Sequence, residues 1–285
     1  MKSDLCILIQ TNDEYEWMWE GIFLSWKLNW NWNQYPIDLY VLTETKDFNK
    51  CHPDSDFKNI NVGQSFIGPS HYSTKMIIAL KKLKELGYKN VLYIQDDSIP
   101  YTSIDNEIFN EILNIFEQEN LDCFYIHEHR KHFPFTLKET GFKIERYRVR
   151  QFVKGSRFYN NHGSGIWNID SLLKLQSHNE GPYENEVATT DRCNLHKPKI
   201  FIINFPWYNQ DWIHEKGIIK ESGIDFFKDL KFRYAWETKE NFMDKYISSF
   251  DSSIIPYSVE DYNNLSEEKQ SELINKSHGS HFSII

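Results

Sequence analysis

Cysteine is scarce in this chain, and its cysteines are not paired. Cys6, Cys51, Cys123 and Cys193 are scattered over 285 residues, with no Cys-x-x-Cys motif. Thiolate zinc sites and redox pairs use close spacing, and disulfide frameworks need denser cysteine. The sequence therefore argues against all three kinds of site and favours a reducing compartment.

Long apolar runs are also missing. The first run, Leu5–Ile9, turns polar by Thr11, whereas a signal-peptide core has ~7–15 apolar residues and a transmembrane helix about 20. We therefore expect a soluble, cytoplasmic protein without a transmembrane segment. Peripheral association with a membrane stays open.

Basic residues are the minority charge. The 32 Lys and Arg are outnumbered by 41 Asp and Glu, which gives a formal net charge of −9 at pH 7. A broad surface that follows nucleic-acid phosphates needs the opposite balance, so we expect no nucleic-acid partner. The remaining composition, 40% hydrophobic and 26% charged, is that of a globular protein.

The chain does contain alternating strand and helix patterns as far as Ile126. Short apolar runs predict strands, and apolar residues at three- and four-residue steps predict helices between them. Asp13 and Ser73 are candidate helix caps, and Gly87 is a candidate helix stop. The predicted strands are Leu5–Ile9, Ile37–Leu42, Val91–Ile94 and Asp122–Ile126, and the predicted helices are Glu14–Trp30, Ser73–Leu86 and Asp105–Glu119. This order is typical of parallel crossover units.

Beyond residue 127 the pattern changes, and the sheet is expected to become mixed. A hairpin is predicted over Lys143–Val153, strands at Ile166–Ile169 and Lys199–Phe205, and helices near Ser171–Leu175 and after Glu186. The segment Thr45–Phe57 reads as a surface loop. We expect an α/β catalytic domain over residues 1–220. Residues 221–285 would form a helical extension packed on it, with a frayed tail.

Two adjacent carboxylates, Asp96 and Asp97, follow the predicted strand Val91–Ile94. Ligands of open α/β sheets bind beyond the carboxyl ends of the strands. A divalent cation relieves the repulsion between such neighbours, and Mg²⁺ or Mn²⁺ typically combines one or two carboxylates with substrate phosphates. The alternative is a solvated acidic turn before Pro100.

The order of these elements, with VLYIQDDS at its centre, resembles GT-A type glycosyltransferases. The similarity is to nucleotide-sugar-dependent enzymes of bacterial polysaccharide synthesis and of large DNA viruses. It implies a Rossmann-like mixed sheet flanked by helices. It also implies Mn²⁺ or Mg²⁺ bound at an Asp-x-Asp element, matched here by Gln95, Asp96 and Asp97. Gln95 departs from the first acidic position.

The resemblance extends to two later segments, 161–168 and 181–186. It places Gly163 and Ser164 near the donor sugar, and matches Glu186, or alternatively Glu184, to a catalytic carboxylate. An inverting transfer needs such a group to remove the acceptor hydroxyl proton. Either glutamate is equally explained as an acidic residue at a helix N-terminus.

Two other segments match donor-binding positions by the same resemblance. His214 corresponds to a third metal ligand and Lys216 to a cation beside the leaving phosphate, although a lone histidine is often a packed surface residue. Thr11, Asn12 and Asp13 follow the first strand, where the family holds base and ribose, with Glu44 as a weaker candidate. Thr, Asn and Asp are equally ordinary helix caps.

The predicted function is transfer of a sugar from a nucleotide-diphosphate sugar to a hydroxyl of a glycan or lipid-linked glycan, metal-assisted and inverting. One alternative is a non-catalytic carbohydrate-binding protein on a decayed GT-A fold, suggested by Gln95. Another is a metal-dependent nucleotidyltransferase or hydrolase that uses Asp96 and Asp97. The chain has neither a Lys-Ser/Thr-ending phosphate loop nor a Gly-x-Ser-x-Gly elbow, which weakens P-loop and α/β-hydrolase readings.

Overall fold

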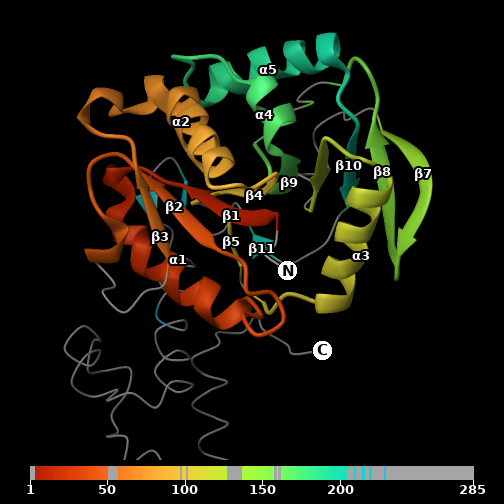
Figure 1. Cartoon of the computed structure of the whole chain (residues 1–285), viewed down its shortest axis with the longest axis horizontal. Helices are drawn as coiled ribbons and strands as arrows, with labels where there is room; N and C mark the ends of the chain where they lie inside the picture. Colours follow the sequence, from red (N-terminus) through yellow and green to blue (C-terminus); the bar gives the residue numbers. More distant parts are fainter. Residues whose placement is uncertain are drawn as a thin grey trace, which may run out of the picture.

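A computed structural model gives the fold of the chain (Figure 1). The structure describes residues 4–50, 57–96, 98–100, 102–126, 137–156, 159, 162–203, 208–209, 214–215, 218–219 and 228. The described part contains one large sheet with the strand order β3-β2-β1-β4-β9-β6-β10-β8-β7. Its strands are β1 (Leu5–Gln10), β2 (Leu39–Thr43), β3 (Lys58–Asn61), β4 (Asn90–Gln95), β6 (Cys123–Tyr125), β7 (Leu137–Ile144), β8 (Tyr147–Phe152), β9 (Gly165–Asn168) and β10 (Ile200–Ile203).

The sheet is mixed, as predicted. Strands β3, β2, β1 and β4 are parallel neighbours. Strand β9 then runs antiparallel between β4 and β6, β10 is parallel to β6, and the β8–β7 hairpin forms the far edge. Two short antiparallel pairs lie outside this sheet: β5 (Ile99–Pro100) with β11 (Tyr208–Asn209), and β12 (His214–Glu215) with β13 (Ile218–Ile219).

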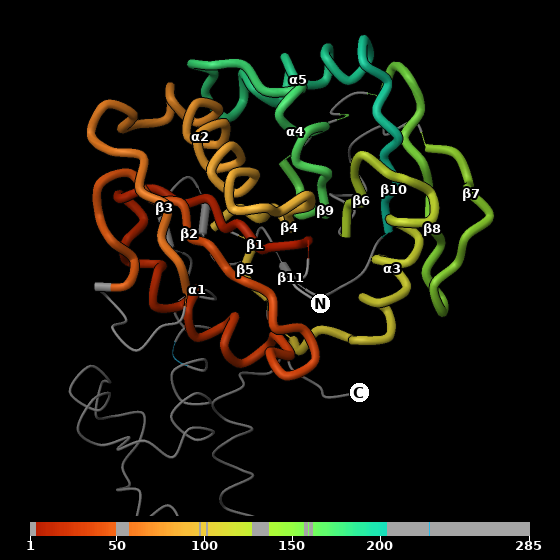
Figure 2. Tube along the Cα trace, in the orientation of Figure 1, coloured from red at the N-terminus to blue at the C-terminus, as the bar shows by residue number. Residues whose placement is uncertain are grey.

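Helices cover both faces of the sheet (Figures 1 and 2). One core contains apolar side chains of α1 (Glu16–Asn29) and α3 (Asn106–Gln118), and the other contains those of α2 (Tyr72–Glu85), α4 (Ile169–Leu175) and α5 (Pro182–His196). Strand β1 alternates between the two cores: Ile7 and Ile9 lie in the first, and Cys6 and Leu8 in the second. Because both faces are covered, the central strands are continuously apolar.

Several local predictions need correction. Asn12, not Asp13, caps the first helical turn, because its side chain accepts from Glu14 N–H. Ser73 lies inside α2 and is not its cap, since the helix already begins at Tyr72. Strand β3 was not predicted, since only one of its four side chains is buried. Gly87 follows the end of α2 with φ of +95°, which confirms it as the helix stop.

The last helix of the second half also begins earlier than predicted. Helix α5 starts at Pro182, so Glu184 and Glu186 both lie inside its first turns. Proline suits this first position because its missing N–H has no intrahelical partner there. Apart from residue 228, the predicted extension 221–285 lies outside the described residues, so the domain division stays a prediction.

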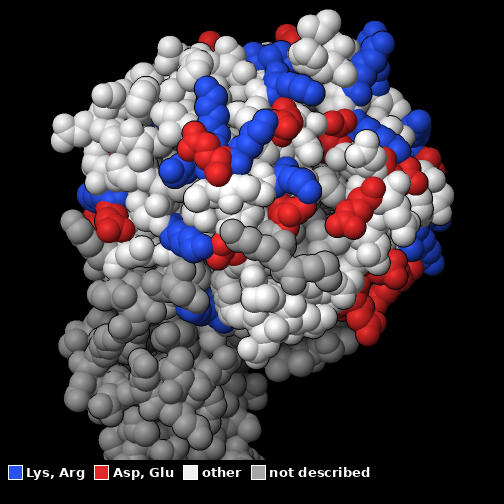
Figure 3. Space-filling model, in the orientation of Figure 1, with Lys and Arg blue, Asp and Glu red and all other residues white. Residues whose placement is uncertain are grey.

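Positive and negative side chains are interspersed on the face of the molecule shown in Figure 3. Exposed lysines of the α2 side lie close to carboxylates, as in the pairs Lys84–Asp170 and Lys89–Asp4. That face therefore carries no uniform basic surface. Among the described helices, none has the length and apolar character needed to cross a bilayer.

Candidate functional site

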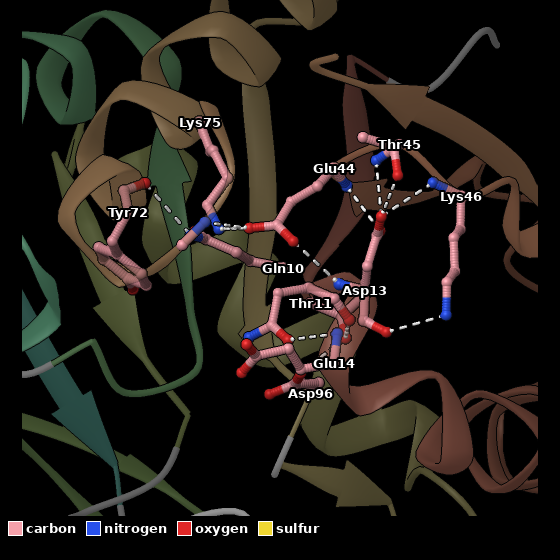
Figure 4. Close-up of polar contacts among 12 residues, drawn as sticks. Gln10, Thr11, Asp13, Glu14, Glu44, Thr45, Lys46, Tyr72, Lys75 and Asp96 are labelled. Atoms are coloured by element: carbon pink, nitrogen blue, oxygen red, sulfur yellow. Dashed lines mark hydrogen bonds and ion pairs between the residues drawn. The ribbon is translucent and has the colours of Figure 1, made fainter. Parts of the chain in front are cut away.

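The carboxyl ends of three neighbouring parallel strands form the candidate site. Gln10, the last residue of β1, is in register with Gln95 of β4 on one side and Leu42 of β2 on the other. The residues that follow these strands therefore meet at one edge, and Figure 4 shows Thr11, Glu44 and Asp96 there. Edges of this kind bind ligands in open α/β sheets.

Asp96 is held from both its backbone and its side chain. Its N–H donates to the Gln10 carbonyl at 3.1 Å, and its Oδ2 accepts from the Thr11 hydroxyl at 2.7 Å. The residue is only 8% exposed. A buried carboxylate with a short hydrogen bond has a restricted orientation, which suits a ligand-binding group.

Gln95 points into a separate polar network on the α2 face of the sheet. Its Nε2 donates to the Tyr72 hydroxyl at 3.0 Å, and that hydroxyl lies 2.5 Å from the Tyr93 hydroxyl. Tyr93 in turn donates to Gln10 Oε1 at 2.9 Å. The residue at the first Asp-x-Asp position is thus part of the packing between β1, β4 and α2.

Asp13 and Glu44 bind each other's backbone. Asp13 N–H donates to Glu44 Oε2 at 3.2 Å, and Glu44 N–H donates to Asp13 Oδ1 at 3.0 Å. Asp13 Oδ2 also accepts from the N–H groups of Thr45 and Lys46. Partial burial raises the pKa of Asp13, but the hydrogen bonds to its charged form together outweigh burial, so the net pKa is lowered. The two carboxylates fix the loops after β1 and β2.

Glu44 also forms a buried ion pair. Lys75 Nζ donates to Glu44 Oε1 at 2.7 Å, and the two side chains are 4% and 2% exposed. The same oxygen accepts from Gly68 N–H at 2.9 Å. Glu44 therefore joins the loop after β2, the loop before α2 and α2 itself, and these elements border the candidate site.

The segment His162–Ser164 lies beside the end of β4. Gly165 of β9 is in register with Tyr93 of β4, and Ile126 N–H donates to the Ser164 carbonyl at 3.0 Å. Gly163 and Ser164 therefore lie where β4 and β6 end, close to the other predicted donor residues. Ser164 is fully buried, and no described group hydrogen-bonds its hydroxyl.

His162 and the start of α5 are tied to the same edge. The His162 ring lies 4.9 Å from the Tyr72 ring, centroid to centroid, and hydrogen-bonds the backbone of Pro182. Burial lowers the pKa of His162 to about 4, so the ring is neutral at physiological pH. Ser73 N–H donates to the Glu180 carbonyl at 3.1 Å, and Ser73 Oγ accepts from Glu180 N–H at 2.9 Å.

Glu180 also binds two side chains of α5. Arg192 makes a bidentate pair with Glu180, with N–O distances of 2.8 and 2.6 Å, and Asn185 Nδ2 donates to Glu180 Oε2 at 2.6 Å. Bidentate pairing fixes direction as well as distance. Helix α5 is therefore oriented relative to α2 and to the strand edge.

The two candidate catalytic glutamates differ in their surroundings. Glu184 is exposed, and its Oε2 accepts from Gly181 N–H at 3.4 Å, which is a helix-capping contact. Glu186 is half-buried, and desolvation raises its pKa to about 7. It lies one turn after Pro182, which His162 contacts. Of the two, Glu186 has the environment expected of a general base.

Some predicted residues cannot be placed in this site. Asp97 and Lys216 lie outside the described residues, and for His214 only the backbone in β12 is described. Within the described residues, no cluster of three or more His, Cys, Asp or Glu side chains forms a metal site. Asp96 alone still fits Mg²⁺ or Mn²⁺, which combine one or two carboxylates with substrate phosphates.

Lys75 and Tyr72 were missed by sequence reasoning, although a signal existed. Lys75 lies three residues after Tyr72 and four before Ala79, on the apolar stripe of α2. A charged residue in such a stripe needs a buried partner, and Glu44 is that partner. The hydrogen bond between Trp19 and Thr11 has no local sequence signal, because it joins a helix to a strand end.

No family model matches this chain, and no curated protein matches it. Among solved structures it is similar to Staphylococcus aureus TarS residues 1–349 in complex with UDP, with 14% identity, 96% of this chain and 78% of that chain covered, and a TM-score of 0.47. It is also similar to a putative nucleotide-diphospho-sugar transferase from Desulfovibrio desulfuricans G20, with 10% identity, 70% of this chain and 79% of that chain covered, and a TM-score of 0.40. A third similar structure is a CMP:2-keto-3-deoxy-manno-octonic acid synthetase complexed with CTP, with 10% identity, 84% of this chain and 100% of that chain covered, and a TM-score of 0.41.

These likenesses assign no substrate to this chain. Its function therefore depends on the side chains at the strand edge and on α5.

Proposed function

We propose that this protein is a glycosyltransferase that moves a sugar from a nucleotide-diphosphate sugar to a hydroxyl of a glycan or lipid-linked glycan. The observation that carries the proposal is the environment of Glu186. This half-buried carboxylate has a pKa near 7 and lies on α5, and Glu180, which precedes α5, is hydrogen-bonded to Ser73 of α2. A general base on α5, and a carboxylate at the strand edge that would hold a cation for the leaving diphosphate, match the two halves of sugar transfer.

In the proposed reaction, the acceptor oxygen attacks the anomeric carbon of the donor. The bond from that carbon to the diphosphate oxygen breaks, and the nucleoside diphosphate leaves with the bonding electrons. Glu186 takes the acceptor hydroxyl proton as the new bond forms. Attack on the face opposite the leaving group inverts the anomeric configuration. A base with a pKa near 7 is available at neutral pH and still basic enough to accept the proton.

At the donor end, Asp96 would hold Mn²⁺ or Mg²⁺ together with Asp97. The metal would supply charge neutralisation to the leaving diphosphate. Gly163 and Ser164 would contact the donor sugar, because they lie where β4 and β6 end. Asn12 and the two loops that Asp13 and Glu44 join would border the nucleotide of the donor. His214 and Lys216 remain candidates for a metal ligand and a phosphate contact.

The proposal is tested by incubating the protein with a panel of UDP-, GDP-, CDP- and dTDP-sugars and mixed glycan acceptors, and measuring release of nucleoside diphosphate. We expect one class of donor to be consumed and its sugar to appear on an acceptor. The Asp96→Asn variant should reduce this rate at least about 100-fold, because it removes a charge that would hold the metal at the donor diphosphate. An Asp96→Asn variant with full turnover would contradict the site.

A further inference from the structure

Two hydrogen bonds link the side chains of Trp19, Thr11 and Asp96 in series. Trp19 Nε1 lies 3.2 Å from Thr11 Oγ1, and Thr11 Oγ1 lies 2.7 Å from Asp96 Oδ2. Trp19 is fully buried, Thr11 is 3% exposed and Asp96 is 8% exposed. The two hydrogen bonds thus connect the apolar core that contains α1 with the candidate site at the strand edge, where Figure 4 shows Thr11 and Asp96.

The chemistry of the three groups fixes the direction of these hydrogen bonds. An indole N–H only donates, and an ionised carboxylate only accepts. The Thr11 hydroxyl must therefore accept from Trp19 and give its single hydrogen to Asp96. A second acceptor, the Asn12 carbonyl, lies farther away at 3.4 Å. The hydrogen of Thr11 is consequently committed to the carboxylate.

The backbone holds both ends of the Thr11–Asp96 contact. Thr11 N–H donates to the Leu42 carbonyl at 3.1 Å, and Asp96 N–H donates to the Gln10 carbonyl at 3.1 Å. The two residues directly follow β1 and β4, which are paired in register up to their last residues. Trp19 is fixed in turn by α1 and by its contact with Phe48, at 5.6 Å between ring centroids.

We propose that Thr11 and Trp19 are positioning residues that set the orientation of the Asp96 carboxylate toward the metal–diphosphate of the donor. This role rests on the proposed function, and it replaces the direct donor contact predicted for Thr11. Partners behind a ligating carboxylate limit its rotation and so raise the affinity of the site. Thr11 acts through Asp96 and does not itself touch the donor.

The test measures Mn²⁺ uptake, which does not require turnover. MnCl₂ is titrated into each folded variant with UDP, GDP, CDP or dTDP present, and free Mn²⁺ is measured by electron paramagnetic resonance. Thr11→Val should weaken Mn²⁺ binding about 10-fold or more, the effect typical of lost outer-shell partners, and Thr11→Ser should stay within about threefold of wild type. Trp19→Phe keeps a ring but loses the donor, so we expect an intermediate loss.

Thr74→Val is the matched control. Thr74 is equally buried, and its Oγ1 accepts from Asn179 N–H at 2.9 Å, away from Asp96. It should lose stability without losing Mn²⁺ affinity. Wild-type affinity in folded Thr11→Val overturns the inference while leaving the proposed function intact. If Thr11→Val does not fold, wild-type affinity in Trp19→Phe overturns it instead. Wild-type protein that takes up no Mn²⁺ with any of the four nucleotides overturns the proposed function and this inference together.

Discussion

Replacing Glu186 with Gln is expected to lower the rate of sugar transfer at least about 100-fold, because the variant cannot accept the acceptor proton. Nucleotide affinity should stay within about twofold of wild type, since Glu186 lies on α5 whereas the proposed donor carboxylate, Asp96, directly follows β4. Donor consumption and nucleotide binding are measured on the same preparations. Glu184→Gln is the matched control, because Glu184 is exposed and belongs to the helix cap.

The pH dependence follows from the same group. Desolvation raises the pKa of Glu186 from 4.5 to about 7. The base acts only when ionised, so kcat/KM should rise about tenfold per pH unit below pH 7 and level off above it. Glu186→Gln should remove this rise from whatever activity remains. A flat profile in the wild type, or a full loss of activity in Glu184→Gln alone, would move the base away from Glu186.

The stability of the fold should fall as the pH rises, whereas kcat/KM should rise. Because the folded-state pKa of Glu186 is raised, its stabilising contribution is fully present below about pH 4.5 and is lost as the pH rises through about 7. A neutral Gln avoids that loss. We expect Glu186→Gln to be more stable than wild type at alkaline pH by about 1–3 kcal/mol, less than the full shift implies because the side chain is partly exposed. Thermal unfolding across this pH range measures it.

Replacing Lys75 with Met is expected to destabilise the fold by about 3–5 kcal/mol, because it leaves the buried Glu44 carboxylate without its cation. Gly68 N–H and Asp13 N–H still donate to Glu44, so the loss should lie toward the lower end. Urea unfolding followed by circular dichroism measures the change. A second variant, Glu44→Gln with Lys75→Met, should recover part of it by removing the unpaired charge.

Lys84→Met is the control for this prediction. Lys84 pairs with Asp170, but these side chains are 55% and 57% exposed, so the loss should stay below about 1 kcal/mol. Equal losses in Lys75→Met and Lys84→Met would show that burial does not make the Lys75–Glu44 pair special. The Lys75 variant should also weaken nucleotide binding, since Glu44 joins the loops around the strand edge.

The sequence allowed much of the sheet to be predicted, because strands buried on both faces appear as short apolar runs. It did not predict that β9 lies between β4 and β6, since that pairing joins residues more than seventy positions apart. The start of α5 was placed too late, although Pro182 at the first position and Glu184 two residues later are helix-start signals.

The candidate site was predictable in part. Thr11 and Asp96 do meet at the strand ends, as the topology of an open α/β sheet requires, and Glu44 binds the backbone of Asp13 two residues after Thr11. The partner of Thr11 was not predictable, because Trp19 reaches it from a helix whose packing is not encoded locally. For Lys75 the apolar stripe of α2 does indicate a buried partner, but not that this partner is Glu44. The donor contact of Thr11 stays a prediction, and the hydrogen bond from its hydroxyl to Asp96 was not predicted.

The most direct test of the central claim is a thermal-shift panel of UDP, GDP, CDP and dTDP, each with and without Mn²⁺, on purified protein. A ligand that binds only the folded state raises its stability by mass action, by about 2.7 kcal/mol at a hundredfold excess over Kd. The account predicts a metal-dependent rise in Tm for at least one nucleotide, and no such rise in Asp96→Asn. No shift with any nucleotide, in protein that is folded, would contradict a nucleotide-sugar transferase.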